Sequence, residues 1–300
     1  MENKIKELYE NGLNYKEIGL KLNKDPRTIK KIIIGNGFKQ LNKIRRCKYV
    51  LNEDYLTHIL DKQLWFLGLM AADGYIINNK TFGIAQSGDD GKTIIEYIKN
   101  ELEYSGPIYE SKTIGDISYS LTITSDKLVD IFSDYNIIRK KSLIYQFPKL
   151  NEENEIKDFI RGYIDGDGSV GVYDNGKGYK YLVISFVGTE DFIKCVGNKI
   201  SIKSSSIRKL SLAENCYEIR WYGKKAIEFG NWVFSNKNLF NSKKNMLFEI
   251  YIIRYSPNFL KYESKKIEVK ELVNSGEKVS EIVKITGIPF QTIYKWKKEF

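Results

Sequence analysis

The sequence predicts an α/β chain of the α+β type, in which two pseudo-symmetric αββαββα halves form a saddle and a small all-α module lies at each end. Three observations predict this architecture. An apolar segment that ends in Asp-Gly occurs twice, at residues 65–76 and 159–170. Each copy is followed by the same order of strand-like and helix-like segments. In addition, residues 5–32 align without a gap to residues 269–296, which indicates a duplicated module.

These patterns divide the 300 residues into five parts. The predicted parts are a first all-α module (1–38), a basic linker (39–60), a first half (61–150), a second half (151–262) and a last all-α module (263–300). A hydrophobic share of 42% is enough to build a core and excludes a disordered chain.

The positive charge of the chain is concentrated at its ends. The net charge is +10; residues 1–48 hold 13 Lys and Arg against 5 Asp and Glu, residues 261–300 hold 9 against 6, and residues 49–260 hold 26 against 27. Such an excess favours an acidic partner, either nucleic acid or an anionic membrane surface. We interpret the ends as attached binding modules, with well-solvated termini as the simpler alternative.

Cysteine and histidine usage restricts the classes of enzyme. Cys47, Cys195 and Cys216 lack the spacing of metal ligands and are odd in number, which indicates free thiols in a reducing compartment. His58 is the one histidine of the sequence, so a Ser-His-Asp triad or an HExxH zinc site would have to use it. It lies at helical spacing, and we interpret it as structural. Without an apolar leader or a run of membrane length, we expect a cytoplasmic protein, bacterial, phage-encoded or organellar, with no signal peptide.

The first module reads as three short helices. Gly12 is typical of a helix C-terminus, Asn14 of the next N-cap, and Asp25-Pro26 of an N-cap followed by proline at the first helical position. The alignment with the last module adds 264 to each number and pairs identical residues at the glycine break, at apolar positions and in the third helix. Both modules resemble helix-turn-helix units, in which the third helix enters the major groove of DNA.

The third helices therefore supply predicted DNA contacts, which are Arg27, Thr28, Lys30 and Lys31 in the first module and Gln291, Thr292 and Lys295 in the last. A generic three-helix bundle without DNA is the alternative. The basic linker, with Arg45 and Arg46, is expected to lie along phosphates, because neutralising phosphates releases counterions; a solvated tether is the alternative there.

The two apolar segments in residues 61–262 are expected to form helices that pack against each other. A helix that is apolar all round needs another helix to bury it, and the obvious partner is its copy. Gly68 and Gly162 would let the two backbones approach closely at this helix interface. Asp73 and Asp167, 94 residues apart, would then lie side by side and repel each other unless a cation lies between them. Oxygen ligands alone fit Mg²⁺ best, although Asp-Gly also simply turns a helix into a strand in many folds.

The segments "FLGLMAADG" and "IRGYIDGDG" resemble the two motif copies of the LAGLIDADG homing endonucleases of the single-chain type, over roughly residues 60–260. The helix-turn-helix ends are similar to accessory DNA-binding modules that some members carry. The resemblance implies that Asp73 and Asp167 are catalytic metal ligands, joined by the carbonyl groups of Ala72 and Gly166. It also implies a site-specific, Mg²⁺-dependent double-strand DNA endonuclease that accepts Mn²⁺ as a substitute, acts as a monomer on a long asymmetric site, and serves intron homing.

The chain departs from the motif at one place. The sixth motif position is Asp165 in the second copy and Ala71 in the first. In the family a polar or basic residue often lies near the metal-bound water, and Gln86 fits that place, whereas its counterpart near Gly188 has nothing to offer. Lys127 and Lys225, or its neighbour Lys224, are further candidates for the catalytic basic group, and each is equally read as a solvated lysine.

The saddle implies a DNA-binding face built from alternate strand residues. The candidates are Asn78, Lys80, Tyr173, Lys177, Lys180, Arg208 and Arg220. The alternative to the endonuclease is a non-cleaving DNA-binding regulator or an intron-splicing RNA-binding protein, a maturase, on the same scaffold. Two acids at matching positions favour the nuclease, because a scaffold used only for binding has no need to hold two carboxylates together.

Overall fold

The structure is a computed structural model that describes residues 1–38, 49–113, 115–174, 176, 180–211, 214–255, 257–298 and 300, without the side chains of residues 113 and 257–263. The chain divides into two compact units, Met1–Val50 and Leu51–Phe300. No helix within the described residues is long and apolar enough to cross a membrane.

The first unit contains three short helices, α1 (Glu2–Glu10), α2 (Tyr15–Leu22) and α3 (Pro26–Gly35). The Asn14 side chain accepts hydrogen bonds from the Lys16 and Glu17 N–H groups, and the Glu17 carboxylate accepts one from the Asn14 N–H. This capping box starts α2. The buried core consists of Ile5, Ile18, Ile29 and Ile33.

The last module, at the end of the second unit, repeats this backbone in α11 (Pro257–Asn274), α12 (Val279–Thr286) and α13 (Phe290–Lys297). Gly276 and Gly287 have positive φ angles of 85° and 68°, and they lie 264 residues after Gly12 and Asn23, whose φ angles are 91° and 49°. The core consists of Val269, Ile282, Ile288, Ile293 and Trp296. The two modules thus share helix order and two left-handed turn positions, and α11 begins before residue 263.

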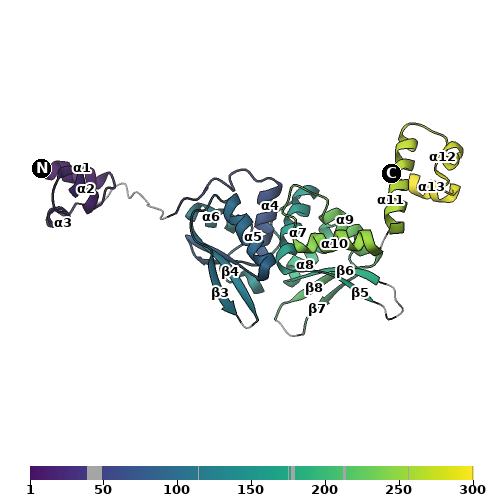
Figure 1. Ribbon diagram of the computed structural model, residues 1–300, viewed down its shortest axis with the longest axis horizontal. Helices are drawn as coiled ribbons and strands as arrows, with labels where there is room; N and C mark the ends of the chain where they lie inside the picture. The colour runs from purple at the N-terminus through teal and green to yellow at the C-terminus, as the bar shows by residue number, and fades with distance from the viewer. Residues whose placement is uncertain are drawn as a thin grey trace. The chain divides into compact units, whose positions relative to one another are not determined.

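The first half begins with α4 (Asp61–Ala72) and continues with β1 (Gly74–Asn78), β2 (Thr81–Ser87), α5 (Gly88–Glu101), β3 (Tyr109–Thr113), β4 (Asp116–Thr124) and α6 (Asp126–Asp134). The second half begins with α7 (Glu153–Asp167) and continues with β5 (Gly168–Asp174), β6 (Lys180–Gly188), α8 (Glu190–Lys199), β7 (Ser206–Lys209), β8 (Tyr217–Tyr222) and α9 (Lys224–Val233). Both halves have the predicted αββαββα order, so the predicted fold class is confirmed (Figure 1).

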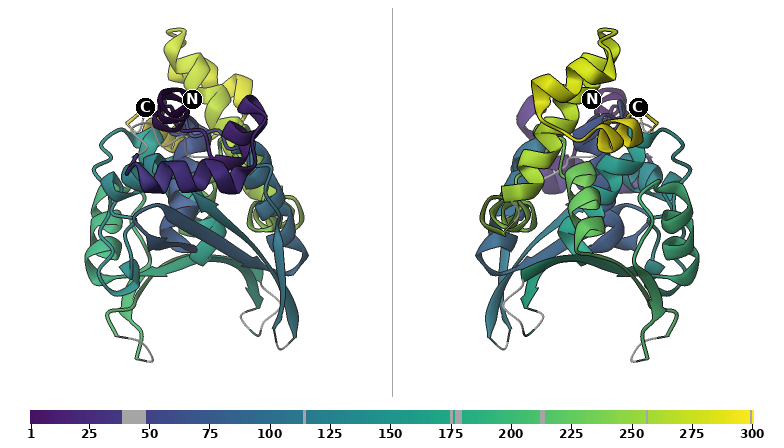
Figure 2. Two further views of the ribbon diagram at one scale, coloured as in Figure 1. Left: turned by 90° about the vertical axis from the view of Figure 1, so that its left-hand side faces the viewer. Right: turned by 90° about the vertical axis from the view of Figure 1, so that its right-hand side faces the viewer.

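The two sheets have the same topology. Their strand orders are β1-β2-β4-β3 and β5-β6-β8-β7, and all neighbouring strands are antiparallel. Alternate residues such as Ile84, Leu121, Phe186 and Trp221 are buried against the helices, because successive side chains of a strand point to opposite faces. The opposite, open face of the two sheets forms the inside of an arch (Figure 2).

Two segments that the sequence did not predict follow the last helix of each half. The first is a single 3₁₀ turn, η1 (Lys141–Leu143), and the second is a helix, α10 (Lys243–Tyr255). Another expectation was wrong: His58 lies in an exposed bend and not on a helix. Cys195 and Cys216 are free thiols, as expected, and Cys47 lies outside the described residues.

Candidate active site at the ends of two paired helices

Helices α4 and α7 pack against each other along their length, and two glycines lie where they cross. A Cβ atom added at Gly68 would lie 1.9 Å from the carbonyl oxygen of Phe159, and one added at Gly162 would lie 1.8 Å from that of Trp65. Real Cβ atoms do not come this close to a backbone oxygen. Any residue larger than glycine would therefore push the two helices apart.

This close crossing brings the two motif aspartates together. Asp73 is the C-cap of α4, and Asp167 is the last residue of α7. A Cβ atom added at Gly166 would lie 2.6 Å from Oδ2 of Asp73. The Asp73 carboxylate therefore reaches across the interface to the residue that precedes Asp167.

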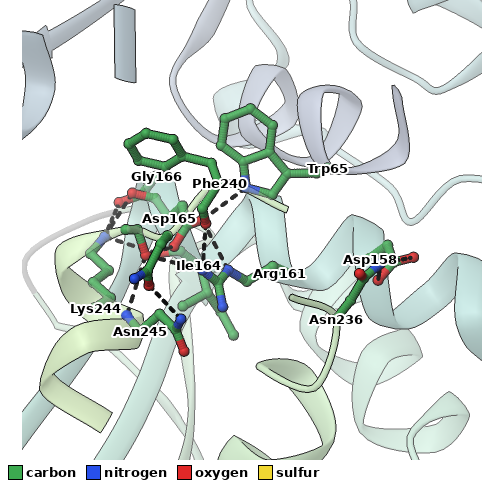
Figure 3. Close-up of polar contacts among 12 residues, drawn as sticks. Trp65, Asp158, Arg161, Ile164, Asp165, Gly166, Asn236, Phe240, Lys244 and Asn245 are labelled. Atoms are coloured by element: carbon green, nitrogen blue, oxygen red, sulfur yellow. Dashed lines mark hydrogen bonds and ion pairs between the residues drawn. The ribbon is translucent and has the colours of Figure 1, made fainter. Parts of the chain in front are cut away.

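A lysine from another segment also contacts the end of each helix, and neither lysine was predicted from the sequence. Lys141 of η1, which is buried, donates hydrogen bonds through Nζ to the carbonyl oxygens of Ala72 (3.2 Å) and Gly74 (2.5 Å). Lys244 of α10 donates to those of Ile164 (2.8 Å), Asp165 (2.9 Å) and Gly166 (2.7 Å), as Figure 3 shows. A cation at a helix C-terminus is favourable because the last carbonyl groups carry partial negative charge.

The two lysines predicted as a basic group have other partners in the structure. Lys127 is exposed and pairs with Asp54, and Lys225 is exposed and donates to the carbonyl oxygen of Ser204 at 3.3 Å. A sequence signal for Lys141 and Lys244 was present, because a Lys-Lys pair, 140–141 and 243–244, follows the last helix of each half.

Gln86 contacts the motif aspartate of its own half. Its Nε2 donates a hydrogen bond of 2.5 Å to Oδ2 of Asp73. Strand pairing makes Gly188 its counterpart, because Gln86 pairs with Tyr119 and Gly188 pairs with Tyr217. A Cβ atom at Gly188 would lie 2.7 Å from Cδ1 of Phe192 and 3.2 Å from the Tyr163 hydroxyl, so those aromatic side chains occupy the space of a second glutamine.

The four charges at the helix ends act on one another. Burial raises the pKa of Asp73, while the Gln86 hydrogen bond and the charges of Lys244 and Lys141 oppose the shift. Burial and then the charge of Asp73 raise the pKa of Asp167 to about 6, again opposed by Lys141 and Lys244. Burial lowers the pKa of both lysines, and the nearby carboxylates oppose that change.

The site contains oxygen donors for a hard cation. Among the described residues, no group of three or more His, Cys, Asp or Glu side chains is placed to hold a metal ion. Two carboxylates with raised pKa values and the carbonyl groups of Ala72 and Gly166 remain, and each carbonyl oxygen has a second lone pair beside the one that the lysine occupies. This donor set fits Mg²⁺, which keeps several waters and needs few protein ligands.

Some of the residues predicted to contact DNA lie on the open face of the sheets. Arg220 lies on it, because its neighbours Ile219 and Trp221 are buried against the helices. Arg208 pairs with Glu218 on the same face, and Tyr173 alternates with the side of β5 on which Val170 is buried. Glu218 lies between the two arginines and accepts from each at 2.7 Å. Lys180 instead pairs with Asp174 at the strand ends.

The remaining predicted contacts fall in turns, in the end modules or outside the described residues. Asn78 is the exposed last residue of β1, Lys80 is exposed in the turn that follows, and the Asn78 side chain accepts a hydrogen bond from the Lys80 N–H. Of the predicted module residues, Arg27, Thr28, Lys30, Lys31, Gln291 and Lys295 are exposed and Thr292 is half-buried. Arg45, Arg46 and Lys177 lie outside the described residues.

Comparisons with known proteins give matches only among solved structures. No protein-family model and no curated protein matches the chain. The structure of the I-LtrWI LAGLIDADG homing endonuclease bound to target DNA is 15% identical, over 78% of this chain and 97% of its own, with a TM-score of 0.45. I-DmoI in complex with DNA and Ca is 15% identical over 66% and 99%, with a TM-score of 0.41.

A third match is the LAGLIDADG meganuclease I-AabMI bound to uncleaved DNA, 12% identical over 68% of this chain and 92% of its own, with a TM-score of 0.43. Each of the three was solved with DNA. Because the identities and TM-scores are this low, the function has to be inferred from the residues of the chain itself.

Proposed function

We propose that this chain is a LAGLIDADG homing endonuclease, a Mg²⁺-dependent enzyme that makes double-strand breaks at a specific DNA site. The observation that carries the proposal is the meeting of Asp73 and Asp167 at the ends of two helices held together by Gly68 and Gly162. Holding two carboxylates against each other costs free energy. A function that uses a divalent cation explains why both are kept.

The two aspartates and the carbonyl groups of Ala72 and Gly166 would hold Mg²⁺, or Mn²⁺ in its place. When bound, the cation supplies an activated water and stabilises charge on the phosphate. Lys141 and Lys244 place positive charge beside the same carboxylates, where a DNA phosphate would bring developing negative charge. Gln86 fixes the orientation of the Asp73 carboxylate.

The sheets support double-stranded DNA with a long, asymmetric site as the partner. On the open face of the first sheet, the residues paired across β2 and β4 include Ala85 with Ser120 and Thr81 with Thr124, whereas the second presents Arg208 and Arg220. Two surfaces of such different chemistry would contact two different half-sites. Since both halves lie in one chain, a monomer suffices.

The terminal modules offer further DNA contacts. Their exposed third-helix residues, Arg27, Lys30 and Lys31 and Gln291 and Lys295, suit the major groove. A DNA-binding regulator or a maturase is the competing function, and nothing in those functions requires the paired carboxylates.

The test is cleavage of a randomised DNA library by the full chain with Mg²⁺ or with EDTA, followed by sequencing of the ends. Metal-dependent breaks at one recurrent long site are expected. Asp73→Asn and Asp167→Asn should each abolish the double-strand break while DNA binding remains. Tight DNA binding by the wild-type chain without breaks, in both Mg²⁺ and Mn²⁺, would leave the regulator or the maturase instead.

A further inference from the structure

Asp165, the sixth residue of the second motif, is a buried carboxylate with three donors (Figure 3). Its Oδ2 accepts hydrogen bonds from Trp65 Nε1 (2.8 Å) and Arg161 Nε (3.0 Å), and its Oδ1 accepts one from Ser242 Oγ (2.6 Å). Asp165 is 3% exposed and Arg161 is 1% exposed. A buried ion pair is a weak source of stability, because desolvation offsets most of the attraction.

Arg161 fastens the chain segment that leads into α10. Its Nη2 donates to the carbonyl oxygen of Phe240 (2.8 Å) and to Ser242 Oγ (3.4 Å). Its guanidinium carbon lies 4.5 Å from the centroid of the Phe234 ring, where a cation is attracted to the aromatic face. The segment before α10 is thus attached to α7 by charged hydrogen bonds.

Ser242 joins this network to the active-site lysine. Its Oγ accepts a hydrogen bond of 3.3 Å from the Asn245 N–H, and its carbonyl oxygen accepts one of 3.0 Å from the Met246 N–H. Ser242 is therefore the N-cap of α10, and Lys244 is the second residue of that helix. The position of the cap sets where the Lys244 side chain starts.

The first half lacks this arrangement. Leu67 and Ala71 stand at the motif positions of Arg161 and Asp165, so the ion pair has no counterpart there. Lys141 lies in a single 3₁₀ turn whose N-cap residue, Lys140, makes no side-chain capping bond. The two lysines thus contact the ends of the two motif helices, but different contacts hold the segments that carry them.

We propose that Arg161, Asp165 and Ser242 form a positioning network for Lys244, so that the network controls the cleavage of only one of the two DNA strands. This inference rests on the proposed endonuclease function. Each lysine lies at the end of one motif helix, and the network touches only one of them.

The experiment measures nicking of each strand of an end-labelled target site by the full chain. Ser242→Ala and the isosteric Asp165→Asn should slow one strand about 10-fold, as removal of an outer hydrogen-bond partner commonly does, and leave the other strand within about twofold. The slowed strand should be the one that Lys244→Met leaves uncut. Ser242→Thr keeps the hydroxyl group and should restore the rate.

Asn236→Ala is the matched control. The Asn236 side chain also bonds to both motif helices, through Asp158 at 3.3 Å and Asp61 at 3.2 Å, and does not contact Lys244. It should lower stability without changing the ratio of the two strand rates. Equal slowing of both strands by Ser242→Ala, or the same change of ratio with Asn236→Ala, would overturn the proposal.

A second readout separates this inference from the proposed function. Brief acetylation of the DNA-free chain, read by mass spectrometry, should find Lys244 protected in the wild type and more reactive in Ser242→Ala, with Lys141 unchanged. If the wild-type chain cuts no DNA, the proposed endonuclease function is refuted. The acetylation experiment needs no cleavage, so it still tests whether the network positions Lys244. Equal protection of Lys244 in both proteins would refute the positioning network.

Discussion

In the first half, Asp73 accepts a hydrogen bond from Gln86, and the lysine at the helix end lies in a short turn without a side-chain cap. In the second half, Gly188 replaces the glutamine, and a buried carboxylate and guanidinium fasten the helix that carries Lys244. In the first half a side-chain hydrogen bond orients the carboxylate of Asp73, whereas in the second half side-chain hydrogen bonds hold the helix that carries Lys244. A duplicated fold can keep equivalent charges at one site while supporting them through unrelated contacts.

The largest effect should come from removing the lysines one at a time. Lys141→Met and Lys244→Met each remove a charge that acts on Asp73 and Asp167. If the proposed function holds, we expect a loss of about 10²–10³-fold in the cleavage of one strand. The two variants should leave nicks in opposite strands, measured with separately labelled strands. If both variants spared the same strand, the assignment of one lysine to each half would be wrong.

The helix crossing should be equally sensitive in both halves. Gly68→Ala and Gly162→Ala each place a methyl group within 2 Å of a backbone oxygen, and we expect a loss of about 3 kcal/mol in the free energy of unfolding from overpacking. Urea titration of the 51–300 unit measures it. Gly197→Ala is the control, because a Cβ atom there lies 3.2 Å from the tip of Ile207. A loss confined to one glycine would show that the crossing is not symmetric.

Gln86 should matter less than the lysines. Gln86→Leu removes the hydrogen bond that opposes the raised pKa of Asp73, and we expect about a 10-fold slower cleavage of one strand and a higher pH requirement. The reciprocal change, Gly188→Gln, should destabilise the chain without speeding the other strand, because Phe192 and Tyr163 fill the space. Faster cleavage by Gly188→Gln would mean that the space is open.

The pH dependence of stability should show the contribution of Asp167. Its pKa of about 6 lies above the value of about 4 in an unfolded chain, so between these values the folded state binds more protons. Stability that this carboxyl group contributes is therefore present below about pH 4 and is lost as the pH rises through about 6. Asp167→Asn should raise the melting temperature at pH 7.5 and leave it unchanged at pH 3.5; a benefit that grows at low pH would contradict this.

The smallest effect should come from the end modules. Arg27→Ala and Gln291→Ala each remove one exposed third-helix side chain, and we expect a loss of about 1 kcal/mol in DNA affinity at fixed salt concentration. Titration of the target site by fluorescence anisotropy measures this loss. Lys16→Ala is a control for charge in general, because Lys16 is exposed on α2 and not on the third helix. Equal losses in all three variants would indicate non-specific attraction alone.

The sequence predicted the fold because its signals are local. Helix breaks, alternating strands and the repeated motif predicted both halves and the pairing of the two helices that end at Asp73 and Asp167. The lysines were missed because η1 and α10 lie beyond the last predicted helix of each half, and only the folded chain brings them back to the motif ends. Lys127 and Lys225 are 98 residues apart, as are Tyr119 and Tyr217 in the preceding strands. This equal spacing made them candidates, yet it does not place a side chain near the two aspartates.

The buried contacts of Asp165 also required the structure, since its partners come from three separate segments. Trp65 is 100 residues away and Ser242 is 77 residues away along the chain. The sequence shows Asp165 and Ala71 as a difference between two motif copies, and nothing local indicates which donors reach the carboxylate.

The hydrogen bond from Trp65 to Asp165 has a consequence for how the halves recognise each other. Trp65 aligns with Phe159 in the motif repeat, and Asp165 aligns with Ala71. Two copies of the first half would bury an indole N–H against alanine, and two copies of the second half would deprive a buried carboxylate of one donor. Only unlike halves satisfy both groups, and an unsatisfied buried polar group costs about 1–3 kcal/mol. If the halves were produced as separate chains, this one bond would favour heterodimers over homodimers.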